Sequence, residues 1–301
     1  MFINYPGRKQ TVPLRIIVPN LFTTVAMCCG LASIHYSLKG DWDRAVFAVV
    51  LSAIFDSLDG RAARLLKVTS PFGEVLDSLS DFLSFGVAPA ILLYEWMFRR
   101  NEILGSDVFG LLAVTTFVVC SAMRLARFTA AARPGAPAAS APAEPGEPDP
   151  ARTALAKARF FTGLATPSAA GAVMVPVMLS YSKLVGPYIR PLYGMKGAGT
   201  GDEAAARLDS AVTDPAGWMG VAVLAYTLLI AFWMVSRVPM FSFKKMHISR
   251  RAVVPMLVGV GLVVVLAVKD LWLLLPVITL AYLLTAPLSW LSHGRLMRRG
   301  A

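Results

Sequence analysis

Residues 56–81 read DSLDGRAARLLKVTSPFGEVLDSLSD and join two apolar segments, Arg44–Leu58 and Phe72–Phe98. The stretch contains two pairs of aspartates, Asp56 with Asp59 and Asp77 with Asp81. Spacings of three and four residues place the members of each pair on one face of a helix. Two antiparallel neighbouring helices would then direct all four carboxylates to one spot. Acidic groups in membrane helices are costly, so this cluster indicates a functional site.

These carboxylates need counter-charge, because four of them cannot all stay ionised in a low-dielectric site. Divalent cations with oxygen ligands, Mg²⁺, Mn²⁺ or Ca²⁺, would supply it, whereas zinc prefers thiols and imidazoles. Two such ions about 4 Å apart would form a clamp for phosphoryl transfer. Gly60, Ala63 and Gly73 would let a phosphate or nucleotide approach the backbone, and Arg64 lies beside them as a phosphate ligand. An ion-transport or proton-relay site also uses membrane acids and stays open as an alternative.

The composition of the whole chain argues against a soluble enzyme. Of 301 residues, 56% are hydrophobic and 16% are charged, whereas an average soluble domain is about 25% charged. The mean hydropathy is +0.62. In a membrane protein, the net charge of +11 is typical of basic cytoplasmic loops beside anionic headgroups, and it requires no nucleic-acid partner.

Apolar segments along the chain predict the fold class. A spanning helix needs about 20 mostly apolar residues. Eight segments qualify: Ile16–Leu38, Arg44–Leu58, Phe72–Phe98, Val108–Phe128, Gly163–Leu184, Trp218–Ser236, Val253–Val268 and Leu271–Leu291. We therefore expect an all-α, polytopic integral membrane protein with about eight transmembrane helices. Only Lys269 and Asp270 separate the last two, which predicts a tight helical hairpin.

The distribution of basic residues predicts the orientation. With the N-terminus inside, 19 of the 29 Lys and Arg residues fall in cytoplasmic segments and nine fall outside. This bias predicts two cytoplasmic termini and an even number of spans. We divide the chain into an N-terminal segment (1–15), a main transmembrane domain with spans one to six (16–236), and a C-terminal hairpin with a basic tail (237–301). The main domain includes a Pro- and Ala-rich stretch, 133–156, predicted as a disordered cytoplasmic linker, and an outside loop, 186–215.

The acidic stretch resembles the signature of the CDP-alcohol phosphatidyltransferases, D-x2-D-G-x2-A-R-x8-G-x3-D-x3-D. All eight fixed positions are present, as Asp56, Asp59, Gly60, Ala63, Arg64, Gly73, Asp77 and Asp81. The runs PNLFTT, FGEVLDSLSDFLSFGVAPA, RLARF and GLATPSAA are similar to those of the prokaryotic family members that use serine as acceptor. The similarity covers about residues 16–172.

The resemblance implies a function, its cofactors and its partners. The reaction would transfer a phosphatidyl group from CDP-diacylglycerol to the hydroxyl of L-serine and release CMP, at the cytoplasmic face of a prokaryotic cytoplasmic membrane. Two divalent ions, Mg²⁺ or Mn²⁺, and a homodimer are also implied. Glycerol 3-phosphate, inositol or choline stays open as the acceptor, because the relatives that use them share the motif.

The resemblance also implies roles for single residues. Asp56, Asp59 and Asp77 would hold the first metal ion, and Asp81 would help to hold the second. Asp81 would also be the base that takes the proton of the acceptor hydroxyl. The implied pocket for CDP-diacylglycerol contains Asp56, Gly60, Ala63, Arg64, Gly73, Ser70 and Asn20.

An amino acid acceptor needs a cation for its carboxylate, and two arginines meet this need. Arg124 and Arg127 are three residues apart, at the cytoplasmic end of a predicted span. We hypothesise that at least one of them binds the carboxylate, because arginine offers bidentate geometry. The alternative is that both contact lipid phosphates or cap the helix end.

Overall fold

The structure is a computed structural model that describes residues 14–66, 70–99, 106, 108–132, 160–193, 215–236, 239–241 and 253–298. The longer helices are α1 (Leu14–Lys39), α2 (Trp42–Leu66), α3 (Pro71–Asp81), α5 (Val108–Ala132), α11 (Pro215–Val235), α12 (Val253–Lys269) and α13 (Leu271–Arg298). The shorter elements are η1 (Phe82–Val87), α4 (Ala88–Leu93), η2 (Tyr94–Phe98), β1 (Phe160–Thr162), α7 (Thr166–Val173), α8 (Val175–Tyr181), α9 (Gly186–Ile189), η3 (Pro191–Tyr193) and β2 (Pro239–Phe241). Helices dominate, which confirms the predicted fold class, and within the described residues the strands form one short pair.

Several helices are suited to a membrane. Among the described residues, four helical stretches are long and apolar enough to cross one: Ile17–Lys39, Pro71–Phe98, Val108–Ala130 and Trp218–Val235. Two shorter helical stretches, Val258–Lys269 in α12 and Leu271–Thr285 in α13, are also apolar. The chain is thus a multi-pass membrane protein, while the count of eight spans and the predicted division into segments stay predictions.

Two predicted spans differ from the observed helices. The second, Arg44–Leu58, is too short, because α2 continues to Leu66 through Ala, Arg and Leu, which favour helix. The fifth, Gly163–Leu184, is divided at Met174 into α7 and α8. Pro176 in the first turn of α8 lacks an N–H donor, which suits the start of a new helix.

Two predicted loops fall wholly or partly outside the described residues. The linker 133–156 lies outside them, as do residues 194–214 of the predicted outside loop. The first part of that loop, Gly186–Tyr193, forms the short helices α9 and η3.

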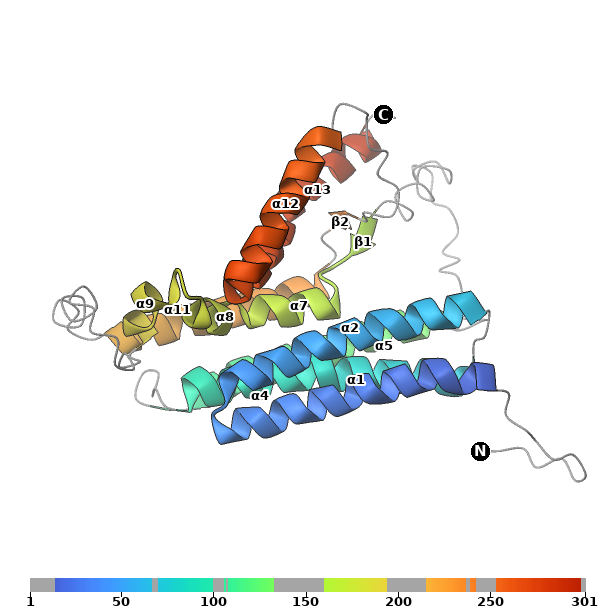
Figure 1. The fold of residues 1–301 in the computed structure, drawn as a ribbon, viewed down its shortest axis with the longest axis horizontal. Coiled ribbons are helices and arrows are strands. Elements are labelled where there is room, and N and C mark those ends of the chain that lie inside the picture. The colour runs from blue at the N-terminus through green and yellow to red at the C-terminus, as the bar shows by residue number, and fades with distance from the viewer. Residues whose placement is uncertain are drawn as a thin grey trace, which may run out of the picture.

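The helices form a bundle of two layers (Figure 1). In it α1, α2, α4 and α5 run side by side, while α7, α8 and α11 lie over them. The α12–α13 hairpin, which confirms the turn predicted at Lys269 and Asp270, is steeply inclined to the rest, and α13 contacts α7, α8 and β2. Large side chains such as Trp96, Phe85 and Phe117 are buried between the layers.

The third membrane helix is continuous from α3 to η2 and contains two π-helical turns, η1 and η2. Glycines let its neighbours approach η1 closely. A Cβ added to Gly30 of α1 would lie 2.6 Å from the Ser84 hydroxyl oxygen, and one added to Gly86 would lie 2.8 Å from the Ser121 hydroxyl oxygen of α5. Backbone contacts on both sides therefore set the position of this helix.

One end of the bundle collects the ends of six helices. The starts of α1, α3 and α7 and the ends of α2, α5 and α11 lie there (Figure 1). Strands β1 and β2 pair antiparallel at this end, with Phe160 opposite Phe241. Gly163 links β1 to α7 with a φ of +75°, and a Cβ there would lie 2.8 Å from two carbonyl oxygens of α11 and the residue after it. The start of α7 is thus held against the end of α11.

Candidate metal centre and substrate site

Three aspartates from two helices converge at this end of the bundle. Asp56 and Asp59 come from α2, and Asp77 comes from α3. One carboxylate oxygen of each lies within 4.8 Å of the others. The two helices bring the predicted pairs together because each spacing matches one helical turn. Three carboxylate oxygens form a donor set that could bind a metal, and they suit a hard divalent cation such as Mg²⁺ or Mn²⁺.

Asp81 lies one turn further along α3 and is linked to the same group. Its carboxyl lies beside that of Asp56, close enough to interact with it electrostatically. Its Oδ1 oxygen is buried and has no hydrogen-bond partner. An unpaired buried acceptor is costly, so a bound cation or a substrate hydroxyl beside Asp81 would satisfy it. The site therefore fits a second cation or a proton donor.

Thr23 of α1 orients one of these carboxylates. Its hydroxyl donates to Asp59 Oδ2 at 2.7 Å and also lies 3.2 Å from the carbonyl oxygen of Pro19. Ser80 of α3 in turn donates to the carbonyl oxygen of Thr23 at 3.2 Å. Thr23 and Asp59 are both buried. The first three helices are thus tied together directly behind the carboxylates.

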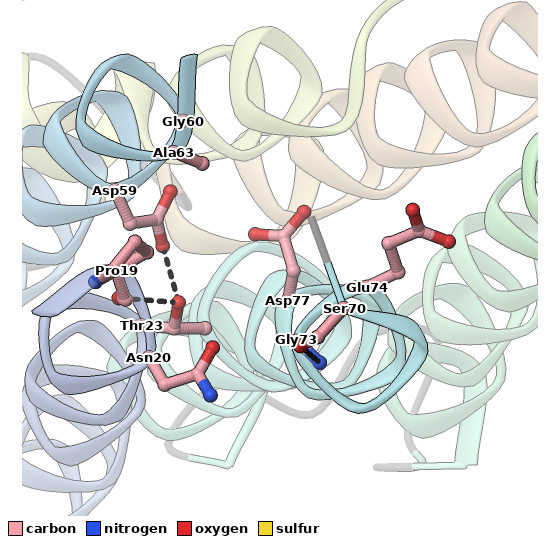
Figure 2. A pocket seen from close by; sticks show the side chains of 10 residues that line it. All are labelled: Pro19, Asn20, Thr23, Asp59, Gly60, Ala63, Ser70, Gly73, Glu74 and Asp77. Carbon is pink, nitrogen blue, oxygen red and sulfur yellow. Dashed lines mark hydrogen bonds between the residues drawn. The ribbon is translucent and has the colours of Figure 1, made fainter. Parts of the chain in front are cut away.

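A cavity of about 110 Å³ opens beside the carboxylates (Figure 2). Figure 2 shows Asp59 of α2 and Asp77 of α3 on two sides of it, with α1 residues completing the wall. Its lining residues are Pro19, Asn20, Thr23, Asp59, Gly60, Ala63, Ser70, Gly73, Glu74 and Asp77. Five of the residues predicted for substrate binding, Asn20, Gly60, Ala63, Ser70 and Gly73, are in this lining.

The start of α3 shapes one wall of the cavity. Ser70 is the N-cap, and its hydroxyl accepts a 3.0 Å hydrogen bond from the Gly73 amide, while Pro71 occupies the first turn. Both choices are typical of helix starts. A Cβ on Gly73 would lie 2.8 Å from Asn20 Oδ1 and 3.1 Å from the Ser70 hydroxyl. Glycine at position 73 therefore leaves room for the side chains of Asn20 and Ser70 where α3 meets α1.

The three predicted arginines have different surroundings. Arg64 is exposed and does not belong to the cavity lining. Arg124 is partly buried and donates to the Thr166 hydroxyl of α7 at 2.7 Å. Arg127 is exposed and donates to the carbonyl oxygen of Val235, the last residue of α11, at 3.2 Å. The two candidates for the acceptor carboxylate thus bind different partners, and the Arg124 guanidinium is close enough to Asp81 to interact with it electrostatically.

Four residues of this region were not predicted from the sequence. Pro19, Thr23 and Glu74 line the cavity, and Thr166 contacts Arg124. Thr23 and Thr166 lie in the runs PNLFTT and GLATPSAA, which resemble sequences of the family. This resemblance was the only signal that could have indicated them. Nothing in their spacing indicates which residue each would contact.

Comparisons with known proteins agree with this geometry. A family model described as CDP-alcohol phosphatidyltransferase matches residues 16–183. The CDP-diacylglycerol–serine O-phosphatidyltransferase of Mycobacterium leprae is 37% identical over 175 residues, which cover 58% of this chain and 50% of that protein. The Helicobacter pylori (strain 26695) protein of the same name is 42% identical over 112 residues, covering 37% and 45%. That of Methanocaldococcus jannaschii is 50% identical over 80 residues, covering 27% and 36%. The matches thus span about half or less of these relatives' lengths.

Proposed function

Because this chain belongs to the CDP-alcohol phosphatidyltransferase family, we propose that it transfers a phosphatidyl group from CDP-diacylglycerol to L-serine and releases CMP. The observation that carries this proposal is the convergence of Asp56, Asp59 and Asp77 beside a glycine-lined cavity. The names of the similar proteins support serine as the acceptor.

Two divalent cations, Mg²⁺ or Mn²⁺, belong to the proposal. Asp56, Asp59 and Asp77 would hold one, and Asp81 would help to hold the second. Bound cations would supply positive charge to the phosphate oxygens and to the departing CMP. Two observations support bound cations: the three aspartates offer carboxylate oxygens as metal ligands, and Oδ1 of Asp81 has no hydrogen-bond partner.

The residues around the cavity have distinct roles in the proposed reaction. Asn20, Gly60, Ala63, Ser70 and Gly73 would surround the cytidine and phosphate groups, and Arg64 would contact phosphate from the exposed side. The serine hydroxyl oxygen would form a bond to the phosphorus that carries diacylglycerol, as the bond from that phosphorus to CMP breaks. CMP leaves with the electron pair, and the hydroxyl proton moves to the Asp81 carboxylate. Arg124 would hold the serine carboxylate, since it interacts electrostatically with Asp81, whereas Arg127 donates to the end of α11.

The membrane arrangement is also a proposal. We infer that both termini and the site face the cytoplasm, because the basic residues favour that side. The similar proteins named above come from prokaryotes, which supports the inner membrane of a prokaryote as the location. The lipid's acyl chains would then stay in the bilayer while serine arrives from water. A homodimer stays a prediction, which light scattering of the detergent-solubilised protein would measure.

CMP release by the purified protein tests this function. The assay supplies CDP-diacylglycerol, Mn²⁺ or Mg²⁺, and one acceptor at a time: L-serine, glycerol 3-phosphate, inositol or choline. We expect release with L-serine only, abolished by EDTA and by Asp77→Asn. Asp43→Asn makes the same chemical change at an exposed position near the other end of α2, and it should keep the activity.

The other outcomes separate the parts of the proposal. Release with a different alcohol would keep the reaction type and overturn serine as the acceptor. Absence of release with every acceptor, from folded protein, would overturn the transferase function. Cation flux in liposomes would then support the transport alternative.

A further inference from the structure

Arg124 belongs to a polar cluster formed by four elements, α3, α5, α7 and α13. Its guanidinium donates to Thr166 at 2.7 Å and is close enough to interact electrostatically with Asp81 and with Tyr282 of α13. Tyr282 also makes a side-chain hydrogen bond with Ser168. Thr166 and Ser168 both lie in the first turn of α7. The cluster therefore connects the C-terminal hairpin to the acidic end of α3.

Two polar atoms in this cluster are buried and unsatisfied. They are the Arg124 Nε donor and the Asp81 Oδ1 acceptor, and neither has a hydrogen-bond partner. Buried polar groups are usually paired, and each exception needs an explanation. A molecule that brings both an acceptor and a donor would satisfy both atoms. A carboxylate placed against Arg124 and a hydroxyl placed against Asp81 are such a pair, and an amino acid with a short hydroxylated side chain carries both.

We propose that Tyr282, together with Ser168, forms a wall of the acceptor subsite and orients Arg124 toward the acceptor carboxylate. This inference rests on the proposed function and extends it, because it makes the C-terminal hairpin part of acceptor selection. Tyr282 acts through Arg124 and is a positioning residue. The packing supports it, since α13 contacts α7 directly, and Arg124 already uses one N–H on Thr166 of that helix.

The position of Tyr282 in the chain sharpens the inference. The family model matches residues 16–183, so α13 lies beyond the matched residues. The proposed metal-binding aspartates lie within them, as do Arg124, Thr166 and Ser168. Recognition of the acceptor would therefore depend in part on a stretch of sequence outside the matched residues.

Steady-state kinetics of Tyr282→Phe test this proposal. The variant keeps the ring and removes the hydroxyl. We expect the KM for L-serine to rise about tenfold, which corresponds to about 1.4 kcal/mol, while kcat and the KM for CDP-diacylglycerol change less than twofold. Tyr226→Phe is the matched control, because its hydroxyl is also partly buried and donates to the Ala172 carbonyl oxygen at 2.9 Å. A structural role alone would move both variants alike.

A second variant covers the case in which Tyr282→Phe fails to fold. Ser168→Ala removes the partner of Tyr282 from the α7 side and should raise the KM for serine in the same direction. An unchanged KM for serine in both folded variants would overturn the acceptor subsite and leave the proposed function intact.

If the proposed function itself is wrong, the experiments give results that differ from those of a wrong subsite. Wild-type protein that uses glycerol 3-phosphate, inositol or choline overturns serine as the acceptor, and it also overturns the orienting role of Tyr282, because none of these alcohols carries a carboxylate for Arg124. If the wild-type protein releases no CMP, thermal stabilisation by L-serine provides the remaining readout. Stabilisation that is lost in Tyr282→Phe would support the subsite, and its absence from the wild-type protein would overturn it.

Discussion

Thr23 on α1 donates a 2.7 Å hydrogen bond to Asp59 Oδ2 on α2. This bond occupies one oxygen of a carboxylate that belongs to the three-aspartate group. The bond therefore helps to fix the orientation of the Asp59 carboxylate relative to Asp56 and Asp77. Hydrogen bonds of this kind fix the orientation of metal ligands, and losing one typically weakens metal binding 10- to 100-fold.

Thr23→Val should therefore raise the Mn²⁺ concentration required for half-maximal activity by about tenfold. The shape of the side chain is kept, while the donor to Asp59 is lost. Activity is measured as a function of metal concentration at saturating substrates. Thr116→Val is the control, because its hydroxyl donates only to the Leu112 carbonyl within α5. An unchanged metal requirement in Thr23→Val would contradict the assigned role of this hydrogen bond.

Gly73→Ala should lower both stability and the affinity for CDP-diacylglycerol. The added Cβ would lie 2.8 Å from Asn20 Oδ1, so the Asn20 side chain must shift or α3 must move away from α1. We expect a loss of about 1–3 kcal/mol, as for other overpacked sites, measured by thermal unfolding in detergent. Gly259→Ala in α12 meets nothing within 4 Å and should instead gain about 0.5–1 kcal/mol. Equal stability of the two variants would show that the contact with Asn20 is loose.

Asp270 attaches the C-terminal hairpin to the end of α8. Its carboxylate accepts hydrogen bonds from the Ser182 hydroxyl at 2.6 Å and from the amides of Leu184 and Leu273, each at 3.1 Å. Burial acts to raise the pKa of Asp270, but these hydrogen bonds outweigh it and lower the pKa below its ordinary value of 3.8. A lowered pKa means that the charged form stabilises the fold above about pH 4. This stabilisation is lost as the pH falls through the folded-state pKa.

Asp270→Asn should consequently destabilise the protein by about 1.5 kcal/mol at pH 7. The difference from the wild type should shrink at a pH below the folded-state pKa, where the wild-type carboxyl is also neutral. Thermal unfolding at a series of pH values measures this. Asp41→Asn, which alters an ion pair with Arg44 that is mostly exposed, should cost about 0–1 kcal/mol. A difference for Asp270→Asn that is constant with pH would exclude an electrostatic origin.

The two arginines of RLARF should separate in kinetics. Arg124→Ala removes the cation beside Asp81 and should raise the KM for serine at least about 30-fold, since a charged hydrogen bond contributes about 2 kcal/mol. Arg127→Ala removes a donor to the end of α11 and should change that KM less than twofold, with a small loss of thermal stability. KM values for serine measured on both variants decide this. The reverse order would move the acceptor site to Arg127.

The acidic group was predictable because it depends on local periodicity. Asp56 and Asp59 are one helical turn apart, as are Asp77 and Asp81, so the helices alone align each pair. The cap at Ser70, followed by proline, is likewise a local signal. The apolar runs predicted most helices for the same reason, since about 20 apolar residues rarely form anything else.

The remaining features depend on contacts between distant segments. The hydrogen bond of Arg124 with Thr166 joins residues 42 positions apart, and that of Thr23 with Asp59 spans 36. Neither has a periodic signal. The pairing of β1 with β2 also arises from packing, including the close approach at Gly163. Sequence patterns predict which functional groups are present here. Tertiary packing decides which other side chains contact those groups.

The π-helical turn η1 begins directly after Asp81, and it has a consequence for how this membrane helix can evolve. A π turn carries one more residue per hydrogen-bonded ring than an α turn. The angular phase of the helix therefore shifts between Asp81 and Gly86. The carboxylates precede the π turn, and the small residues that meet α5 follow it. These two groups of residues therefore do not have to share one face of a regular α-helix. Relatives can thus change how this helix packs against its neighbours without rotating the carboxylates away from the chemistry.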